Sequence, residues 1–328
     1  MQEFYKGKNV LITGGVGFIG SSIAKKLVEF GANVFIMDSM CPDYGGNLFN
    51  IESIKSSVNV NISDMRDPYS TEYLVKGKDV IFNLAGQVSH IDSMKNPFQD
   101  LEINCTAQLS LLELCRKVNP AVKIVFASTR QIYGRAEYLP LDEKHIVNPI
   151  DVNGINKAAG ERYHTLYNNI YGIKACALRL TNTYGPRQLI KHNKQGFIAW
   201  FINRLVTNNK IAIFGDGMQT RDFNYIDDVV NAFLVAGKNS VADGEVFNLG
   251  GTEPVTLKAL TEQMIEINGA GEYELVPFPD EKKQIDLGSC SCSFDKIKNV
   301  LGWVPVVSLR DGLIATLNYY KEHKAHYL

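Results

Sequence analysis

The feature that most constrains this chain is a glycine-rich segment, TGGVGFIG at residues 13–20, between a short apolar run and an amphipathic stretch. It contains the pattern G-x-G-x-x-G, which starts at Gly15, and an overlapping G-x-x-G-x-x-G, which starts at Gly14. The run Val10–Thr13 predicts a strand, and Phe18–Phe30 has the periodicity of a helix. Glycines at such a junction allow a tight turn and let a pyrophosphate approach the N–H groups that begin the helix. We therefore predict a dinucleotide site here.

The nucleotide that this site prefers is indicated by Asp38. This residue ends the next apolar run, Val34–Met37, and comes 18 residues after Gly20. A carboxylate in this place can accept hydrogen bonds from both ribose hydroxyls of the adenosine, and it repels the 2′-phosphate of NADP. The sequence therefore predicts NAD as the cofactor.

The first 180 residues alternate between apolar runs and longer amphipathic stretches, a spacing typical of a doubly wound parallel sheet. Runs such as VIFNLA at residues 80–85 are apolar without alternation, as expected for strands that are covered on both faces. We predict an α/β fold with a Rossmann-type NAD-binding domain over residues 1–180. Beyond Val34–Met37, the expected strands are 59–62, 79–85, 123–128 and 174–180, and the expected helices are 69–76, 98–118 and 154–171.

The pattern loosens after Leu180, and we predict a smaller α/β lobe over residues 181–328 that binds the substrate. Residues 222–250 are expected to fold back onto the first domain. The expected helices of this part are 197–208, 227–238, 256–267, 293–301 and 308–323, and the expected strands are 211–214, 246–249 and 273–278.

Composition and charge exclude several classes of protein. The 328 residues carry a formal net charge of −1, so the chain lacks the basic footprint of a nucleic-acid-binding protein. No apolar stretch approaches the ~20 residues that span a membrane, and the start, MQEFYKGKNVLITGG, lacks the pattern of a signal peptide. We therefore expect a cytoplasmic protein without nucleic-acid or membrane partners. Cys290 and Cys292 form a C-x-C with no second Cys/His pair nearby, so no metal site is predicted.

Several further motifs follow the glycine segment in a fixed order. Together they resemble the extended short-chain dehydrogenases/reductases that act on sugar nucleotides, the NAD-dependent epimerase/dehydratase family, and the resemblance covers nearly the whole chain. The motifs are DMRD at 64–67, NLAGQVS at 83–89, ASTRQIYG at 127–134, RLTNTYGPRQ at 179–188, FGDGMQTRDFNYIDDVV at 214–230 and LGWVP at 301–305.

The resemblance implies which residues hold the cofactor. Asp64 and Met65 would touch adenine, and Lys157 would bind the nicotinamide ribose. The expected cofactor-binding residues are Gly14, Gly17, Phe18, Ile19, Gly20, Asp38, Asp64, Met65, Leu84, Ala85, Gly86 and Lys157.

The resemblance also implies that the substrate is a nucleotide-diphosphate sugar. Thr129, four residues before Tyr133, would hydrogen-bond the sugar hydroxyl that is oxidised, whereas Tyr133 itself is expected to be structural. Asn182 and Arg221 would contact the diphosphate, since a guanidinium fork pairs well with phosphate oxygens. Two further residues, Ser89 and Arg130, are expected substrate contacts.

One position departs from the family. Its members carry a catalytic Tyr-x-x-x-Lys, but here the lysine is Lys157 and the tyrosine position holds Asn153. An amide does not titrate near neutral pH, so Asn153 can orient a hydroxyl but cannot act as the base. Three alternatives follow. His90, whose imidazole titrates near neutrality, replaces the base; water mediates a slow reaction; or the protein binds NAD and a nucleotide sugar without turnover.

The residues after Thr129 favour one type of reaction. Dehydratases of the family carry an acidic pair there, and decarboxylases carry a glutamate in the second place, but this chain has Arg130 and Gln131. Removal of water from a sugar needs a positioned acid, which neither residue supplies at neutral pH. The leading hypothesis is an NAD-dependent nucleotide-sugar epimerase, similar to 2- and 4-epimerases and above all to UDP-glucose 4-epimerase. The alternatives are a nucleotide-sugar dehydrogenase or dehydratase, and a non-catalytic binding protein. The candidate catalytic residues are Thr129, Lys157, His90 and Asn153.

The helices expected at 98–118 and 154–171 resemble those through which family members pair into a four-helix bundle. We therefore expect a homodimer. This expectation comes from the resemblance rather than from the composition of the two helices.

Overall fold

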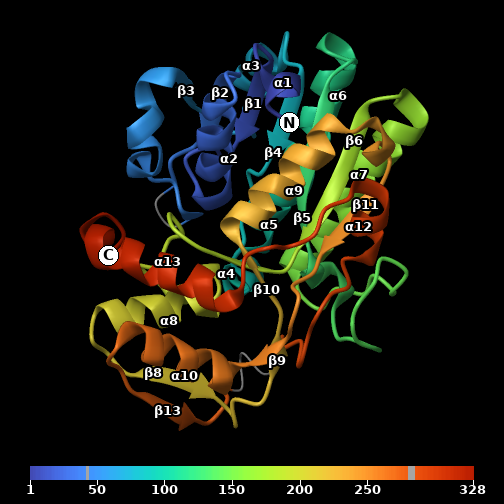
Figure 1. Cartoon of the computed structure of the whole chain (residues 1–328). Coiled ribbons are helices and arrows are strands. Elements are labelled where there is room, and N and C mark those ends of the chain that lie inside the picture. Colours follow the sequence, from blue (N-terminus) through green and yellow to red (C-terminus); the bar gives the residue numbers. More distant parts are fainter. Residues whose placement is uncertain (42–43, 280–284) are drawn as a thin grey trace.

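The computed structural model describes residues 1–41, 44–279 and 285–328, and its centre is a seven-stranded parallel sheet (Figure 1). The strand order is β11-β6-β5-β4-β1-β2-β3, which confirms the predicted doubly wound fold. The order reverses between β1 and β4, and in such sheets a crevice opens there at the carboxyl ends of the strands. The strands are β1 (Asn9–Thr13), β2 (Asn33–Asp38), β3 (Val58–Ile62), β4 (Val80–Asn83), β5 (Lys123–Thr129), β6 (Lys174–Leu180) and β11 (Val246–Leu249).

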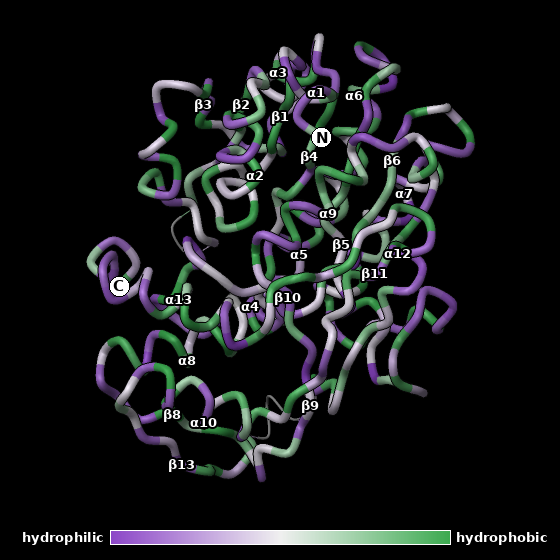
Figure 2. Tube along the Cα trace, viewed as in Figure 1, coloured by the Kyte–Doolittle hydropathy of each residue, from purple (hydrophilic) through white to green (hydrophobic). Residues whose placement is uncertain are grey.

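Helices cover both faces of this sheet (Figure 1). Successive side chains of β1 point to opposite faces: Val10 and Ile12 pack with α2 and α9, and Leu11 packs on the other side with α3, α6 and α7. All three residues are fully buried, which accounts for the continuous apolar runs of the strands (Figure 2). The helices are α2 (Phe18–Glu29), α9 (Ile226–Lys238), α3 (Pro68–Val75), α6 (Ala107–Val118) and α7 (Val152–Tyr171).

A second group of elements lies at the carboxyl ends of the strands, in the lower part of Figure 1. Here α8, α10 and α13 pack around short strand pairs, of which β8–β13 is parallel and β9–β12 is antiparallel. The elements are α8 (Phe197–Val206), α10 (Leu257–Asn268), α13 (Leu309–His323), β7 (Asn182–Tyr184), β8 (Ile211–Phe214), β9 (Thr220–Arg221), β10 (Phe223–Tyr225), β12 (Val255–Thr256) and β13 (Tyr273–Val276).

Two differences from the sequence expectation lie between β4 and β5. Residues after the fourth strand, expected as a loop, form the short helix α4 (His90–Lys95), which the hydroxyl of Ser89 caps. The helix expected at 98–118 consists of α5 (Pro97–Leu101), a π-helical turn η3 (Glu102–Thr106) and α6. Such turns interrupt helices mostly at functional sites, and this one carries Asn104, which is buried beside the cavity described below.

The remaining elements are short. No helix in the described residues combines the length and the apolar composition needed to cross a membrane. All six cysteines are free thiols. The short elements are α1 (Gln2–Tyr5), η2 (Leu48–Ser57), η4 (Arg130–Tyr133), η5 (Asn193–Gln195), η6 (Ser240–Ala242), α12 (Asp295–Leu301) and η7 (Lys324–His326).

Candidate functional site

A cavity of about 380 Å³ lies at the carboxyl ends of β1, β2, β4 and β5, where the strand order reverses. It brings together all the candidate residues except Ser89 and Arg221. Those that line it are Gly14, Gly17, Phe18, Ile19, Gly20, Asp38, Asp64, Met65, Leu84, Ala85, Gly86, His90, Thr129, Arg130, Asn153, Lys157 and Asn182.

The glycine loop between β1 and α2 forms one wall of the cavity. A Cβ on Gly20 would lie 2.2 Å from the carbonyl oxygen of Gly14, so no side chain fits there. Gly14 itself has a φ of +68°, and a Cβ would lie 3.1 Å from the backbone nitrogen of Ala85. No side chain in the described residues caps α2, so the first N–H groups of this helix remain available to an anion.

Asp38 is held at the end of β2 by backbone donors. Its Oδ1 accepts from the N–H of Met40 at 2.9 Å, and its Oδ2 accepts from the N–H of Val16 at 3.1 Å. Burial raises the pKa of this carboxyl, and the two hydrogen bonds oppose that shift. Each oxygen keeps a lone pair, which suits the expected contacts with two ribose hydroxyls.

Thr13, which the sequence analysis did not single out, joins the glycine loop to the segment after β4. Its hydroxyl donates to Oδ1 of Asn83 at 2.9 Å and accepts from the N–H groups of Leu84 and Ala85 at 3.0 and 3.1 Å. The two expected pyrophosphate-lining segments therefore share one hydroxyl, which fixes the distance between them.

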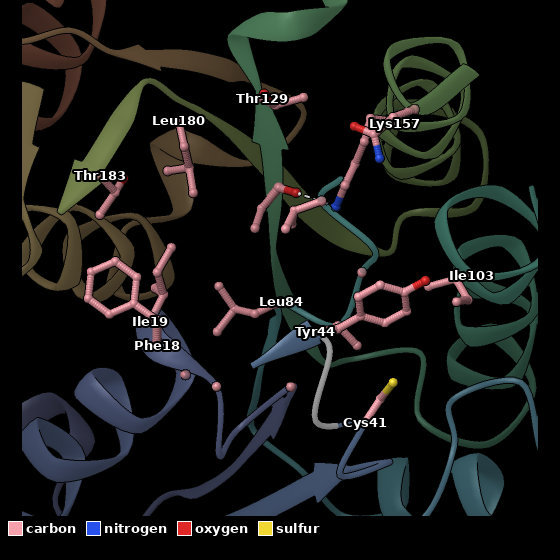
Figure 3. A pocket seen from close by; sticks show the side chains of 18 of the residues that line it. Phe18, Ile19, Cys41, Tyr44, Leu84, Ile103, Thr129, Lys157, Leu180 and Thr183 are labelled. Carbon is pink, nitrogen blue, oxygen red and sulfur yellow. Dashed lines mark hydrogen bonds between the residues drawn. The ribbon is translucent and has the colours of Figure 1, made fainter. Parts of the chain in front are cut away.

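Lys157 reaches from α7 to the end of β5 (Figure 3), and its Nζ donates to the carbonyl oxygen of Ala127 at 3.2 Å. Burial lowers the pKa of this amine to about 8, although the charge of Asp100 opposes the shift. A Cβ on Gly86 would lie 2.8 Å from Nζ. The absence of a side chain at Gly86 therefore leaves the lysine amine room at the cavity wall.

Asn153, at the position where the resemblance leads us to expect a tyrosine, is 98% buried and held by its neighbours. Its Nδ2 donates to the carbonyl oxygen of Gln87 at 2.8 Å and to Oδ2 of Asp100 at 3.1 Å. Two more amides, those of Asn104 and Asn156, donate to the same Asp100 carboxylate at 3.1 and 2.8 Å. Both protons of the Asn153 amide are thus engaged, so the side chain fastens α7 to α5 and to the loop after β4.

Thr129 ends β5, and its hydroxyl accepts from the N–H of Gln131 at 3.2 Å. The side chain of Gln131 in turn donates to Oδ2 of Asp151 at 3.0 Å, and the same oxygen lies 3.0 Å from Nδ1 of His90. Neither Gln131 nor Asp151 was a candidate on sequence. No local pattern could have found them, because the contacts join segments that lie far apart along the chain.

Tyr133, the tyrosine of the segment ASTRQIYG, does not line the cavity. It is fully buried, accepts from Nη1 of Arg179 at 2.6 Å and donates to Oδ1 of Asn248 at 2.7 Å. Burial raises its pKa. The structure agrees with a structural role for Tyr133.

Two expected substrate contacts use their polar groups elsewhere. The hydroxyl of Ser89 accepts from the N–H of Asp92 and caps α4. Arg221 donates from Nη1 to the carbonyl oxygens of Thr220 and Gly288 at 2.9 and 2.5 Å. By contrast, Nη1 of Arg130 is buried and has no hydrogen-bond partner among the described residues. Of the two candidate arginines, Arg130 is the one that lines the cavity with an unused donor.

Residues 10–250 match the model of the NAD dependent epimerase/dehydratase family. A putative UDP-glucose 4-epimerase of Methanocaldococcus jannaschii is 36% identical over 319 residues, which cover 96% of this chain and 99% of that relative.

Solved structures of similar proteins share the whole fold. The UDP-glucose 4-epimerase of Thermotoga maritima, solved with UDP-glucose, superposes with a TM-score of 0.87 at 33% identity, over 96% of this chain and 99% of that one. The UDP-glucose 4-epimerase of Thermus thermophilus, solved with NAD, gives a TM-score of 0.85 at 30% identity, over 95% and 99% of the two chains.

Proposed function

The chain belongs to the NAD-dependent epimerase/dehydratase family, and from that premise we propose that it is a nucleotide-sugar epimerase that oxidises its sugar transiently. It is an enzyme of this family and its cofactor is NAD. The observation that carries the proposal is that the glycine loop, Thr129, Lys157 and Asn182 all line the same cavity.

The residues of the cavity fit NAD. The N-terminus of α2 and the space kept open by Gly14 and Gly20 suit a pyrophosphate, and the two oxygens of Asp38 suit a ribose diol. Asp64 and Met65 line the adenine end of the cavity in this assignment, and Lys157 holds the nicotinamide ribose. When bound, NAD supplies an acceptor for a hydride from the sugar carbon and can return that hydride.

The sugar would be oriented by Thr129, whose hydroxyl proton is free to donate because its oxygen accepts from Gln131. On the side of the second lobe, the buried Nη1 of Arg130 and the side chain of Asn182 line the cavity. A guanidinium N–H buried without a partner gains strongly from a phosphate oxygen. We assign residues 181–328 to binding of the nucleotide sugar and residues 1–180, with 222–250, to binding of NAD.

The absence of an acid beside Thr129 favours epimerisation over dehydration. Arg130 and Gln131 occupy the two positions after Thr129, and Gln131 is committed to Asp151. No group there can lend a proton to a leaving hydroxyl at neutral pH. The cavity therefore supplies what oxidation and return of a hydride require, and lacks at these positions what loss of water requires.

The test is a panel of UDP-, GDP-, CDP- and dTDP-sugars incubated with the purified protein and followed by NMR. We expect inversion at one sugar carbon without accumulation of NADH, and loss of that turnover in Lys157→Ala. Stoichiometric NADH would indicate a dehydrogenase, and a 4-keto-6-deoxy product would indicate a dehydratase. An unchanged panel would indicate a binding protein, and each of these three results contradicts the proposal.

We also propose that the enzyme is a homodimer through α5, η3, α6 and α7. Apolar side chains are exposed along these helices: Phe98 and Leu101 on α5, and Ile155, Leu166 and Ile170 on α7. A second copy would bury these side chains. We expect Leu166→Glu to convert a dimer into a monomer in analytical ultracentrifugation, whereas Val241→Glu, at an exposed apolar residue of η6, leaves the dimer intact. A monomeric unmodified protein would contradict this proposal.

A further inference from the structure

A carboxylate and an imidazole meet beside the cavity, where two helices begin. His90 is the first residue of α4, and Asp151 precedes and caps α7. Nδ1 of His90 lies 3.0 Å from Oδ2 of Asp151. The N–H of the ring is not aimed straight at the oxygen, and such contacts are often loosely aligned before substrate binds. The Asp151 side chain is fully buried, whereas the His90 side chain is 36% exposed and lines the cavity.

Asp151 is fixed from several sides. Its Oδ1 accepts from the N–H of Gly154 at 2.6 Å, and its Oδ2 accepts from Nε2 of Gln131 at 3.0 Å. Burial raises the pKa of Asp151, but the nearby imidazole of His90 and the hydrogen bonds from Gly154 and Gln131 lower it by more, so the carboxyl stays ionised at neutral pH. A fixed anion at Nδ1 selects the tautomer that carries its proton there and leaves a lone pair on Nε2.

The same frame holds Thr129, which orients the sugar hydroxyl in the proposed reaction. Gln131 donates its backbone N–H to the Thr129 hydroxyl and its side-chain amide to Asp151. Gln131 therefore links Thr129 to Asp151, the carboxylate beside His90. His90 and Thr129 both line the cavity.

We propose that His90 is the catalytic base that takes over from the absent tyrosine, and that Asp151 is its positioning residue; this inference rests on the proposed epimerase function. Oxidation of the sugar carbon, for which bound NAD would accept the hydride, turns the hydroxyl into a carbonyl and releases the hydroxyl proton. Nε2 of His90 would take that proton and would give it back to the same oxygen when the carbonyl is reduced.

The other titratable groups around the pair do not match this role. Asp92, on the same helix as His90, pairs with Lys194 at 3.0 Å. The phenol of Tyr44 reaches into the cavity (Figure 3), but burial and the charge of Asp92 raise its pKa, which disfavours proton uptake by a phenolate at neutral pH. Asp151 is the carboxylate within ion-pair distance of His90 among the described residues.

The first test compares variants on the nucleotide sugar that the panel identifies. We expect His90→Gln to lower kcat by roughly 10²–10⁴-fold and Asp151→Asn to lower it at least tenfold, although asparagine can still cap α7. The double variant should be no slower than His90→Gln, because the two residues act as one unit. Asp92→Asn should retain activity within about threefold, and Tyr44→Phe should lower kcat by far less than His90→Gln does.

The second test needs no turnover. In NAD-loaded protein, ¹⁵N NMR of His90, assigned by its absence in His90→Gln, should show the Nδ1–H tautomer, and the share of this tautomer should fall in Asp151→Asn but not in Asp92→Asn. If the wild type turns over a sugar and His90→Gln does so equally fast, or if Tyr44→Phe is the variant that loses activity, this inference is wrong and the epimerase function stands. If the wild type turns over no sugar of the panel, both are wrong.

Discussion

The cofactor half and the sugar half of the cavity are built in different ways. The cofactor half consists of consecutive backbone, the loop Gly14–Gly20 and the segment Leu84–Gly86, where added Cβ atoms would collide with backbone or with Lys157. The sugar half consists of side chains from distant segments, joined by Gln131 and Asp100. The first half is therefore fixed by local sequence and should tolerate few substitutions. The shape of the second half depends on hydrogen bonds between side chains, such as those of Asn153 and Gln131.

The largest effect should come from filling the tightest point of the cofactor half. In Gly20→Ala the new Cβ would lie 2.2 Å from the oxygen of Gly14, whereas in Gly17→Ala the nearest atom would be 3.2 Å away. We expect Gly20→Ala to weaken NAD binding at least ~100-fold, about 2.7 kcal/mol, and Gly17→Ala to weaken it clearly less. Calorimetry on cofactor-free protein measures both. If both variants lost NAD affinity equally, the close backbone contact at Gly20 would not explain the loss.

The sugar half can be challenged by restoring the family's tyrosine. Because Asn153 is buried and both its amide protons are engaged, Asn153→Tyr should lower the free energy of unfolding by about 2–4 kcal/mol, through overpacking and unpaired acceptors on Gln87 and Asp100. It should not raise the rate. The matched control is Asn169→Tyr, at an exposed position of the same helix. If Asn153→Tyr were faster than the wild type, the tyrosine would act as the base at this position, and no other residue would have replaced it.

Lys157 lies between the two halves, and its titration provides a pH test. The amine has a pKa of about 8 in the folded protein and an ordinary value of 10.5. Between these values the unfolded chain binds more protons, so the wild type gains stability as pH rises from about 8 to 10.5. We expect Lys157→Met to be more stable than the wild type below pH 8, by about 1–3 kcal/mol, with the difference shrinking above it. Urea unfolding across pH, with exposed Lys174→Met as the control, measures this; a pH-independent difference would contradict it.

The smallest expected effect concerns Asp38 and the choice of coenzyme. Asp38→Asn keeps one acceptor oxygen but removes the charge that repels a 2′-phosphate. NAD affinity should fall about tenfold, about 1.4 kcal/mol, and the preference for NAD over NADP should shrink. Calorimetric titration with both coenzymes measures the ratio. An unchanged ratio would show that Asp38 does not discriminate between them.

The sequence predicted the cofactor half of the cavity better than the sugar half. Apolar runs located the central strands of the sheet because those strands are buried on both faces, and the glycine spacing located the cofactor loop because its geometry excludes side chains. The sequence predicted no helix at the short polar α4, since six residues give too little periodicity to recognise. The contact between His90 and Asp151 spans about sixty residues, and no local pattern records it.

Ser89 and Arg221 show a further limit. Their residue types suit a substrate, and their motif positions implied that role, but the structure uses the Ser89 hydroxyl as a helix cap and the Arg221 guanidinium for backbone carbonyls. Hydrogen-bonding capacity can be read from a residue's identity, whereas the partner that takes it up depends on the tertiary fold. Their contact with a nucleotide sugar stays a prediction.

The proposed epimerisation requires that one sugar carbon in this cavity lose a hydrogen and regain the same hydrogen on its other face. The most direct measurement uses the nucleotide sugar that the panel identifies, deuterated at the carbon that inverts and incubated with the NAD-loaded protein in ordinary water. We expect an epimer that keeps its deuterium at that carbon, as measured by ²H and ¹H NMR. An epimer that carries solvent hydrogen there would contradict it.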